Sequence, residues 1–264
     1  MQNLSLTCAC FVAALGLFPS PALRGASTDS KPIDPRLLER FEARVHKEPS
    51  GHALNYRLFK PQPLAPGTNY PLVLFLHGAA GLGDDNARQF NGGNEVPPLA
   101  LIAEAAQARF PHYVLVPQCP RGQSWSSYSD GISVPLRLTM DVVKSLQREF
   151  PIDPRRLYVV GVSMGGRGVW ETLLRYPNVF AAAVPICAAG DAVGINKLKD
   201  LPIWCFHGAA DTTVPVDYAR KAMEALRKAG GHPKYTEYPG VGHDSYRNAF
   251  QEPELLPWLF AQHK

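Results

Sequence analysis

The chain has 264 residues, of which 45% are hydrophobic, and this length suffices to bury the core of one ordinary α/β domain. It contains no internal repeat, low-complexity tract or long run of charge. Its 27 basic and 23 acidic residues are interspersed and give a formal net charge of +4, a balance that argues against a nucleic-acid-binding protein. We therefore expect a soluble, mildly basic protein that binds no nucleic acid and does not insert stably into a membrane.

The first 22 residues differ in character from the rest. Residues 4–18 are nearly continuous apolar sequence, which is short for a bilayer span, and Ser20 and Ala22 fit the small-x-small cleavage rule of secretory signal peptides. No Lys or Arg precedes the apolar run, so an uncleaved tail or a misassigned start stays open as an alternative. We expect a secreted or periplasmic protein with a signal peptide over residues 1–22, an N-terminal lead over 23–40 and one catalytic domain over 41–264.

The remaining sequence alternates between strand-like and helix-like segments. Apolar runs rich in β-branched residues predict strands, and Ala/Leu spacing at the helical period predicts helices. This alternation predicts an α/β fold, with a mostly parallel sheet covered by helices on both faces. In chain order we expect strands over 41–46, 53–60 and 71–77, a helix over 96–109, a strand over 112–117, a helix over 134–150, a strand over 156–162, a helix after Ser163, strands over 180–187 and 201–207, a helix over 216–229, a strand over 234–238 and a helix near 253–262.

The most informative stretch spans residues 157–166, an apolar strand that enters a Gly-x-Ser-x-Gly turn and then a helix. This pattern is typical of a nucleophile elbow with Ser163 at its tip. Gly161 and Gly165 are small because side chains there would collide across so tight a turn. The start of the helix offers backbone N–H groups that favour negative charge.

An acid and then a histidine follow the elbow in the order that such a site requires. Asp211 comes directly after the strand expected over 201–207, and His243 follows the strand expected over 234–238. A serine hydroxyl is a poor nucleophile at neutral pH, so we expect His243 to take its proton and Asp211 to fix the tautomer of that histidine. Three nearby residues remain as alternative acids: Asp191, Asp217 and Asp244.

An acyl-transfer site also needs donors for the developing oxyanion. We expect one to be the backbone N–H of Met164 and the other to be that of Ala79, on the glycine-rich loop after the strand over 71–77. His77 is expected to orient this loop rather than to act as a second base. The acidic and amide side chains of residues 84–86 are expected to hold the loop by bonds to its backbone.

With these motifs the chain resembles the α/β-hydrolase superfamily, specifically the bacterial carboxylesterases grouped with dienelactone-hydrolase-like, feruloyl-esterase-like and phospholipase/carboxylesterase proteins. The resemblance implies an eight-stranded sheet, a Ser163/Asp211/His243 triad, no metal or cofactor, and hydrolysis of carboxylic esters through an acyl-enzyme. One departure is Arg121, where many relatives carry an acidic residue, and another is the segment 187–191, which is more hindered than usual. The matching segments are 74–78, 116–120, 161–166, 206–211 and 242–243.

The expected substrate follows from a short connection between two of the expected strands. Only residues 188–200 separate two apolar strands at the place where many lipases insert a lid, so we expect no large cap. An open site suits short-chain or aryl esters, including acetyl or feruloyl groups carried on a plant polysaccharide. Trp125 and Tyr128 lie on the loop over 121–128, where they could stack on an aromatic acyl group or a sugar, or simply cover a helix end.

Two other function classes stay open. A serine peptidase of the prolyl-oligopeptidase type uses the same triad but usually carries an added N-terminal domain. A non-catalytic binding protein of the same fold tends to lose a member of the triad.

The cysteines outside the expected signal peptide number three, so at most one disulfide can form among them. A pair between Cys187 and Cys205 is conceivable, but burial of all three as small apolar residues is the favoured interpretation. No Cys/His spacing resembles a metal site.

Overall fold

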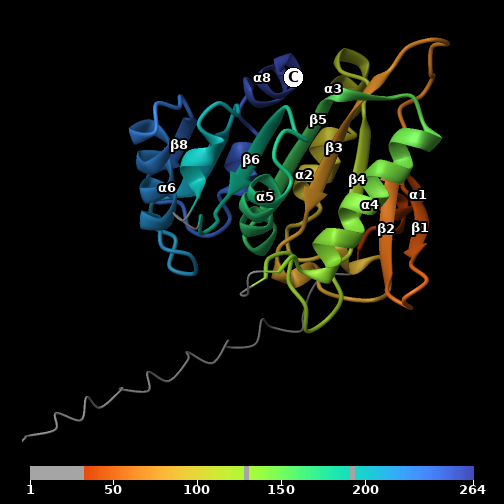
Figure 1. The fold of residues 1–264 in the computed structure, drawn as a ribbon, viewed down its shortest axis with the longest axis horizontal. Coiled ribbons are helices and arrows are strands. Elements are labelled where there is room, and N and C mark those ends of the chain that lie inside the picture. The colour runs from red at the N-terminus through yellow and green to blue at the C-terminus, as the bar shows by residue number, and fades with distance from the viewer. Residues whose placement is uncertain (1–32, 128–130, 191–193) are drawn as a thin grey trace, which may run out of the picture.

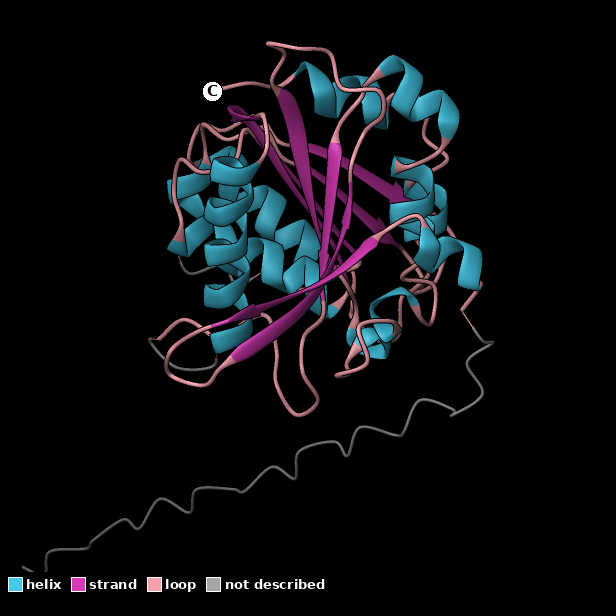
Figure 2. Cartoon of the chain, turned by 90° about the vertical axis from the view of Figure 1, so that its right-hand side faces the viewer, coloured by secondary structure: helices cyan, strands magenta, loops and turns pink. Residues whose placement is uncertain are grey.

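The computed structural model describes residues 33–127, 131–190 and 194–264. Its centre is an eight-stranded sheet with the order β1-β2-β4-β3-β5-β6-β7-β8 (Figure 1). β2 pairs antiparallel with β1 and with β4, and every other neighbouring pair is parallel, so β2 alone runs against the rest. Helices cover both faces of the sheet (Figure 2). The predicted fold class is confirmed, and the described residues contain no large cap.

The strands and helices have the following bounds. The strands are β1 (Glu42–Lys47), β2 (Ala53–Phe59), β3 (Tyr70–Leu76), β4 (Tyr113–Pro117), β5 (Ile152–Val162), β6 (Ala182–Ile186), β7 (Trp204–Gly208) and β8 (Lys234–Tyr238). The α-helices are α1 (Pro35–Glu39), α2 (Val96–Leu101), α3 (Glu104–Arg109), α4 (Val134–Glu149), α5 (Met164–Arg175), α6 (Asp217–Lys228), α7 (Tyr246–Ala249) and α8 (Leu255–Ala261). Three short 3₁₀ turns are η1 (Ala79–Gly81), η2 (Arg88–Phe90) and η3 (Ile195–Leu198).

Two hydrophobic cores lie on opposite faces of the sheet. Every residue of β3 is buried, and successive side chains alternate between the faces, with Leu72 and Leu74 in one core and Val73 and Phe75 in the other. The first core is closed by α4, α5 and α6, and the second by α1, α2, α7 and α8. Burial on both faces explains why the central strands are continuous apolar runs in the sequence.

The helix expected over 96–109 is in fact two helices, α2 and α3. No Gly or Pro marks the break between them, at Ile102 and Ala103. Ile102 is fully buried, and its carbonyl accepts a hydrogen bond of 2.5 Å from the guanidinium of Arg40. The break therefore coincides with a tertiary contact, which the local sequence does not show.

The N-terminal lead also contains a helix that the sequence analysis did not predict. α1 begins after Asp34, whose carboxylate accepts from the backbone N–H of Arg36 and so caps the helix. Leu37 anchors α1 in the second core.

The cysteines Cys119, Cys187 and Cys205 are free and buried, which is the favoured prediction. Burial raises the pKa of the Cys119 and Cys205 thiols to about 12. These thiols are therefore protonated at neutral pH and act as apolar side chains. Among the described helices, none has the length and apolar character needed to cross a membrane.

A buried histidine, His112, precedes β4 and should make the fold sensitive to acid. Its Nδ1 donates to the carbonyl of Phe110 at 2.5 Å, and its ring lies 4.5 Å from that of Phe260. Burial lowers the pKa of His112 to about 4, so the ring stays neutral in the folded protein at pH values where the unfolded chain takes up a proton.

We predict that the free energy of unfolding falls as the pH drops from 7 to 5, because the unfolded state binds more protons over this range. The His112 contribution to this loss is about 2 kcal/mol. Urea unfolding at both pH values measures it: His112→Gln should weaken the pH dependence by about that amount, whereas His263→Gln, at an exposed position, should not. Equal pH dependence in His112→Gln and the unchanged protein would contradict the assignment.

Candidate active site

Ser163 lies at the turn between β5 and α5, in a strained backbone conformation. Its φ is 56° and its ψ is −116°, a region that a residue with a Cβ rarely adopts. Its backbone N–H donates to the carbonyl of Ile186 on the neighbouring strand β6 at 2.9 Å, which holds the turn against the sheet. The hydroxyl is thus presented at the carboxyl edge of the sheet.

The glycines around Ser163 are required by close contacts between backbones. A Cβ on Gly161 would lie 2.3 Å from the carbonyl oxygen of Gly165, and a Cβ on Gly165 would lie 1.8 Å from that of Leu76. Neither oxygen can move away, because both belong to the backbone of packed elements. The first turn of α5 can therefore approach β3 and β5 only where side chains are missing.

The three residues of the predicted triad come together. His243 Nε2 lies 2.8 Å from Ser163 Oγ, and His243 Nδ1 lies 2.7 Å from Asp211 Oδ2. Both distances are in the range for productive proton transfer and orientation. The carboxylate of Asp211 is fully buried, while the His243 side chain is 29% exposed and so can be reached from solvent.

Asp211 is held by donors on all sides. Its Oδ1 accepts from the backbone N–H groups of Thr213 and Val214, both at 2.9 Å. Its Oδ2 faces His207 Nε2 at 3.3 Å as well as His243. Of the alternative acids, Asp217 pairs with Arg220, Asp244 lines the pocket in front of Ser163, and Asp191 lies outside the described residues.

His207 is a buried second histidine beside this carboxylate, and sequence reasoning gave it no role. Its side chain is fully buried, and Nε2 lies 2.9 Å from the carbonyl of Val214 as well as 3.3 Å from Asp211. Nδ1 has no hydrogen-bond partner, so the ring proton belongs on Nε2, where it can be shared between the two oxygens. His207 therefore ties the carboxylate of Asp211 to the loop that follows β7.

The predicted oxyanion donors occupy the places that sequence reasoning gave them. Ala79 begins η1 and lines the same pocket as Ser163, and Met164 is the first residue of α5. The N–H of Gly78, next to Ala79, is already engaged by Asn94 Oδ1 at 2.7 Å. This bond holds the backbone of the loop in place at Gly78, the residue immediately before Ala79. Their role as donors stays a prediction.

His77 orients this loop through both of its ring nitrogens. Nδ1 donates to the carbonyl of Gly78 at 2.7 Å, and Nε2 accepts from the backbone N–H of Cys119 at 2.9 Å. Burial lowers the pKa of His77 to about 4, so the ring is neutral at pH 7. Because both ring nitrogens form buried hydrogen bonds, His77 links the loop after β3 to the loop after β4.

Residues further along the loop also hold it by bonds to the backbone. Asp85 Oδ1 accepts from the N–H groups of Ala87 and Arg88, and Asn86 Nδ2 donates to the carbonyls of Arg44 and Tyr56. Asn86 itself has a positive φ of 53°. The predicted side-chain to backbone bonding is thus present at these two positions.

The prediction that Trp125 stacks on substrate is wrong. Its side chain is fully buried, its Nε1 donates to the carbonyl of His77 at 2.9 Å, and its ring lies edge-on to the imidazole of His77 at 5.0 Å. Ser133 Oγ also donates to its carbonyl. Trp125 supports the loop from beneath because its indole N–H finds a buried acceptor there. Tyr128, the other predicted substrate contact, lies outside the described residues.

The pocket in front of Ser163 is small, about 280 Å³. Sequence reasoning gave no role to three of its residues, Asn94, Thr213 and Tyr246, which come from the loop before α2, the loop after β7 and the start of α7. The described residues contain no group of three or more His, Cys, Asp or Glu side chains that could hold a metal ion. The pocket is lined by Gly78, Ala79, Ala80, Gly92, Asn94, Val162, Ser163, Thr213, His243, Asp244 and Tyr246.

A comparison with protein families matches residues 66–254 to the phospholipase/carboxylesterase family. The chain belongs to this family. A solved thermostable esterase is 36% identical, with a TM-score of 0.82 over 87% of this chain and 64% of its own. This chain therefore spans just under two thirds of that protein.

Two curated relatives also match. A probable carboxylesterase of Oryza sativa subsp. japonica is 24% identical over 204 residues, or 68% of this chain and 84% of the relative. A bifunctional acetylxylan esterase/xylanase of Neocallimastix patriciarum is 28% identical over 168 residues, or 63% of this chain and 22% of the relative. The family and the fold support carboxylic-ester hydrolase activity.

We predict that Gly165→Ala lowers the free energy of unfolding by about 1–3 kcal/mol or more, because the added methyl group meets the carbonyl of Leu76. The matched control is Gly242→Ala, beside His243, where the nearest atom to a new Cβ is 4.0 Å away. Urea denaturation should show a clearly smaller loss for the control. Equal losses would show that the contact between α5 and β3 is not tight.

We predict that His207→Phe lowers kcat for p-nitrophenyl acetate about tenfold with little change in KM, because Asp211 loses a buried donor. His207→Gln, which keeps a donor, should recover part of the lost kcat. A loss of stability with an unchanged kcat would contradict this positioning role of His207.

Proposed function

We propose that this protein is a serine carboxylic-ester hydrolase that works through an acyl-enzyme. The observation that carries the proposal is the chain of two short contacts, 2.8 Å from Ser163 Oγ to His243 Nε2 and 2.7 Å from His243 Nδ1 to Asp211 Oδ2. A serine hydroxyl becomes an effective nucleophile only when a base can take its proton, and this arrangement provides one.

In the proposed first half-reaction, Ser163 Oγ attacks the ester carbonyl while His243 Nε2 takes the hydroxyl proton. The N–H groups of Ala79 and Met164 donate to the oxyanion of the tetrahedral intermediate. His243 then gives its proton to the departing alcohol, which leaves an acyl group on Ser163. The buried carboxylate of Asp211 stabilises the imidazolium that forms between these two steps.

In the second half-reaction, a water molecule replaces the alcohol. His243 takes a proton from the water as its oxygen attacks the acyl-serine, and then returns that proton to Ser163 Oγ as the carboxylic acid leaves. The 29% exposure of the His243 side chain is compatible with this step, because the alcohol must depart and the water must arrive on that side. The free enzyme is restored with no other reactant.

We propose short-chain or aryl esters as substrates, with acetyl or feruloyl groups on plant polysaccharide as the candidate natural source. The pocket of about 280 Å³ supports a small acyl group, and the described residues lack a cap that would cover a long chain. One of the relatives is named for acetylxylan esterase activity. A secreted or periplasmic location, which the apolar run over residues 4–18 suggests, would bring the enzyme to such a polymer.

We predict that Ser163→Ala abolishes turnover of p-nitrophenyl acetate and butyrate in a folded protein, because no nucleophile remains. The unchanged enzyme should release a burst of p-nitrophenol, and mass spectrometry after an acid quench should find the acyl group on the peptide that contains Ser163. The control is Ser50→Ala, at an exposed serine of the loop between β1 and β2.

Substantial activity in purified Ser163→Ala would contradict the serine mechanism. An unmodified Ser163 during turnover would leave ester hydrolysis in place but overturn the acyl-enzyme.

A further inference from the structure

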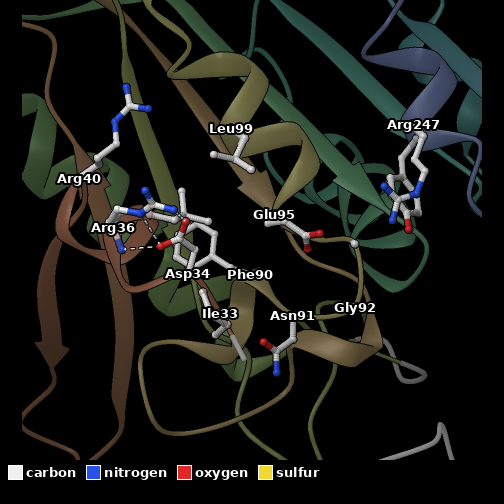
Figure 3. A pocket seen from close by; sticks show the side chains of 13 residues that line it. Ile33, Asp34, Arg36, Arg40, Phe90, Asn91, Gly92, Glu95, Leu99 and Arg247 are labelled. Atoms are coloured by element: carbon white, nitrogen blue, oxygen red, sulfur yellow. Dashed lines mark hydrogen bonds and ion pairs between the residues drawn. The ribbon is translucent and has the colours of Figure 1, made fainter. Parts of the chain in front are cut away.

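A second, larger hollow lies beside the catalytic pocket. Its volume is about 740 Å³, more than twice that of the pocket at Ser163. One wall comes from α1 and the residues on either side of it, and the other from α2, the loop before α2 and α7 (Figure 3). We call it the α1 groove. It is defined here by Asp34, Leu37, Phe90, Glu95, Tyr246 and Arg247.

The α1 groove and the catalytic pocket are adjacent. Gly92 and Tyr246 border both of them. Gly93 also lines the groove, with a φ of 91°, and a Cβ on it would lie 1.9 Å from the hydroxyl of Tyr246. The glycine backbone at residues 92–93 and the ring of Tyr246 thus pack tightly together at the boundary between the groove and the catalytic pocket. A substrate too large for 280 Å³ would pass this border into the groove.

The surface of the groove combines an apolar floor with a charged rim. Leu37 and Phe90 are buried beneath it, at 5% and 1% exposure. On the rim, Asp34 and Arg36 neutralise each other through an ion pair of 2.9 Å, which Figure 3 marks with dashed lines. Arg40, Glu95 and Arg247 are the further charged groups that line the groove. The guanidinium of Arg40 donates to the carbonyl of Ile102, and that of Arg247 lies 5.4 Å over the ring of Tyr246.

This distribution selects one class of ligand. A long alkyl chain would remove water from the charged rim and give it no partner in return. An anion would lie close to the carboxylates of Asp34 and Glu95. A neutral polyhydroxylated ligand suits both parts, because each hydroxyl can accept from an arginine and donate to a carboxylate, while carbon-bound faces pack on the floor. The volume is also ordinary for a ligand site.

We propose that the α1 groove binds the carbohydrate carrier of the ester while its acyl group lies at Ser163. This inference rests on the proposed function. Contacts to a remote part of the substrate raise kcat/KM for the linked ester over that for a small one when they position the reacting bond. α1 lies outside residues 66–254, which match the family, so the groove is built in part by a segment beyond the family match.

The test compares an acetylated xylo-oligosaccharide with p-nitrophenyl acetate in Glu95→Gln and Arg247→Gln. The ratio of kcat/KM for the two substrates should fall about tenfold or more in each variant, because a charge-assisted hydrogen bond to the carrier is lost. The matched controls are Glu104→Gln, at the exposed start of α3, and Arg109→Gln, whose guanidinium lies 4.9 Å over the ring of Phe110. Both controls should keep the ratio.

A second measurement is independent of turnover. Calorimetric titration of Ser163→Ala with an unacetylated xylo-oligosaccharide should show binding, and adding Glu95→Gln to this variant should weaken it. A ratio and a binding constant unchanged by the groove variants would overturn the carrier site while leaving esterase activity intact. A selective loss of p-nitrophenyl decanoate hydrolysis in these variants would overturn it in favour of an acyl chain. If the unchanged enzyme hydrolyses no ester, the proposed function fails. The titration then tests by itself whether the α1 groove binds a carbohydrate.

Discussion

The contact between the first turn of α5 and the edge of β3 is the constraint on which the site depends. The backbone of Gly165 lies against the carbonyl of Leu76, at a distance that leaves no space for a Cβ. This closeness forces the turn at Ser163 into its strained conformation and directs the hydroxyl toward the loops at the carboxyl ends of the strands. Packing of the whole sheet therefore supports the strain of a single residue.

Two buried histidines keep those loops in place around Ser163. His77 joins the loop after β3 to the backbone after β4, and His207 joins Asp211 to the carbonyl of Val214. Each ring offers a donor to a buried oxygen at a place where the chain turns. The reacting groups are thus held by side chains that do not touch the pocket, as preorganised sites require.

The solvent exposure of the side chains differs between Asp211 and His243 in a way that suits proton transfer. Asp211 is fully buried and surrounded by donors, whereas His243 is partly exposed and Ser163 opens into a small pocket. The fixed charge is thereby shielded from water, while the group that moves protons remains accessible. Beyond the pocket, Tyr246 separates the reaction centre from the α1 groove, so the chemistry and the proposed carrier contacts are adjacent but distinct.

The sequence alone determined the fold class, the order of the main strands and helices, and the residues that meet at the elbow, because hydrophobic period and tight turns leave local patterns. Only the tertiary structure decided that Trp125 is buried, that a helix breaks at Ile102, and that Asn94 and the α1 groove adjoin the site. The reason is physical. Burial, a shared hydrogen bond and a hollow between segments depend on which distant parts of the chain pack together, and no local stretch of sequence contains that information.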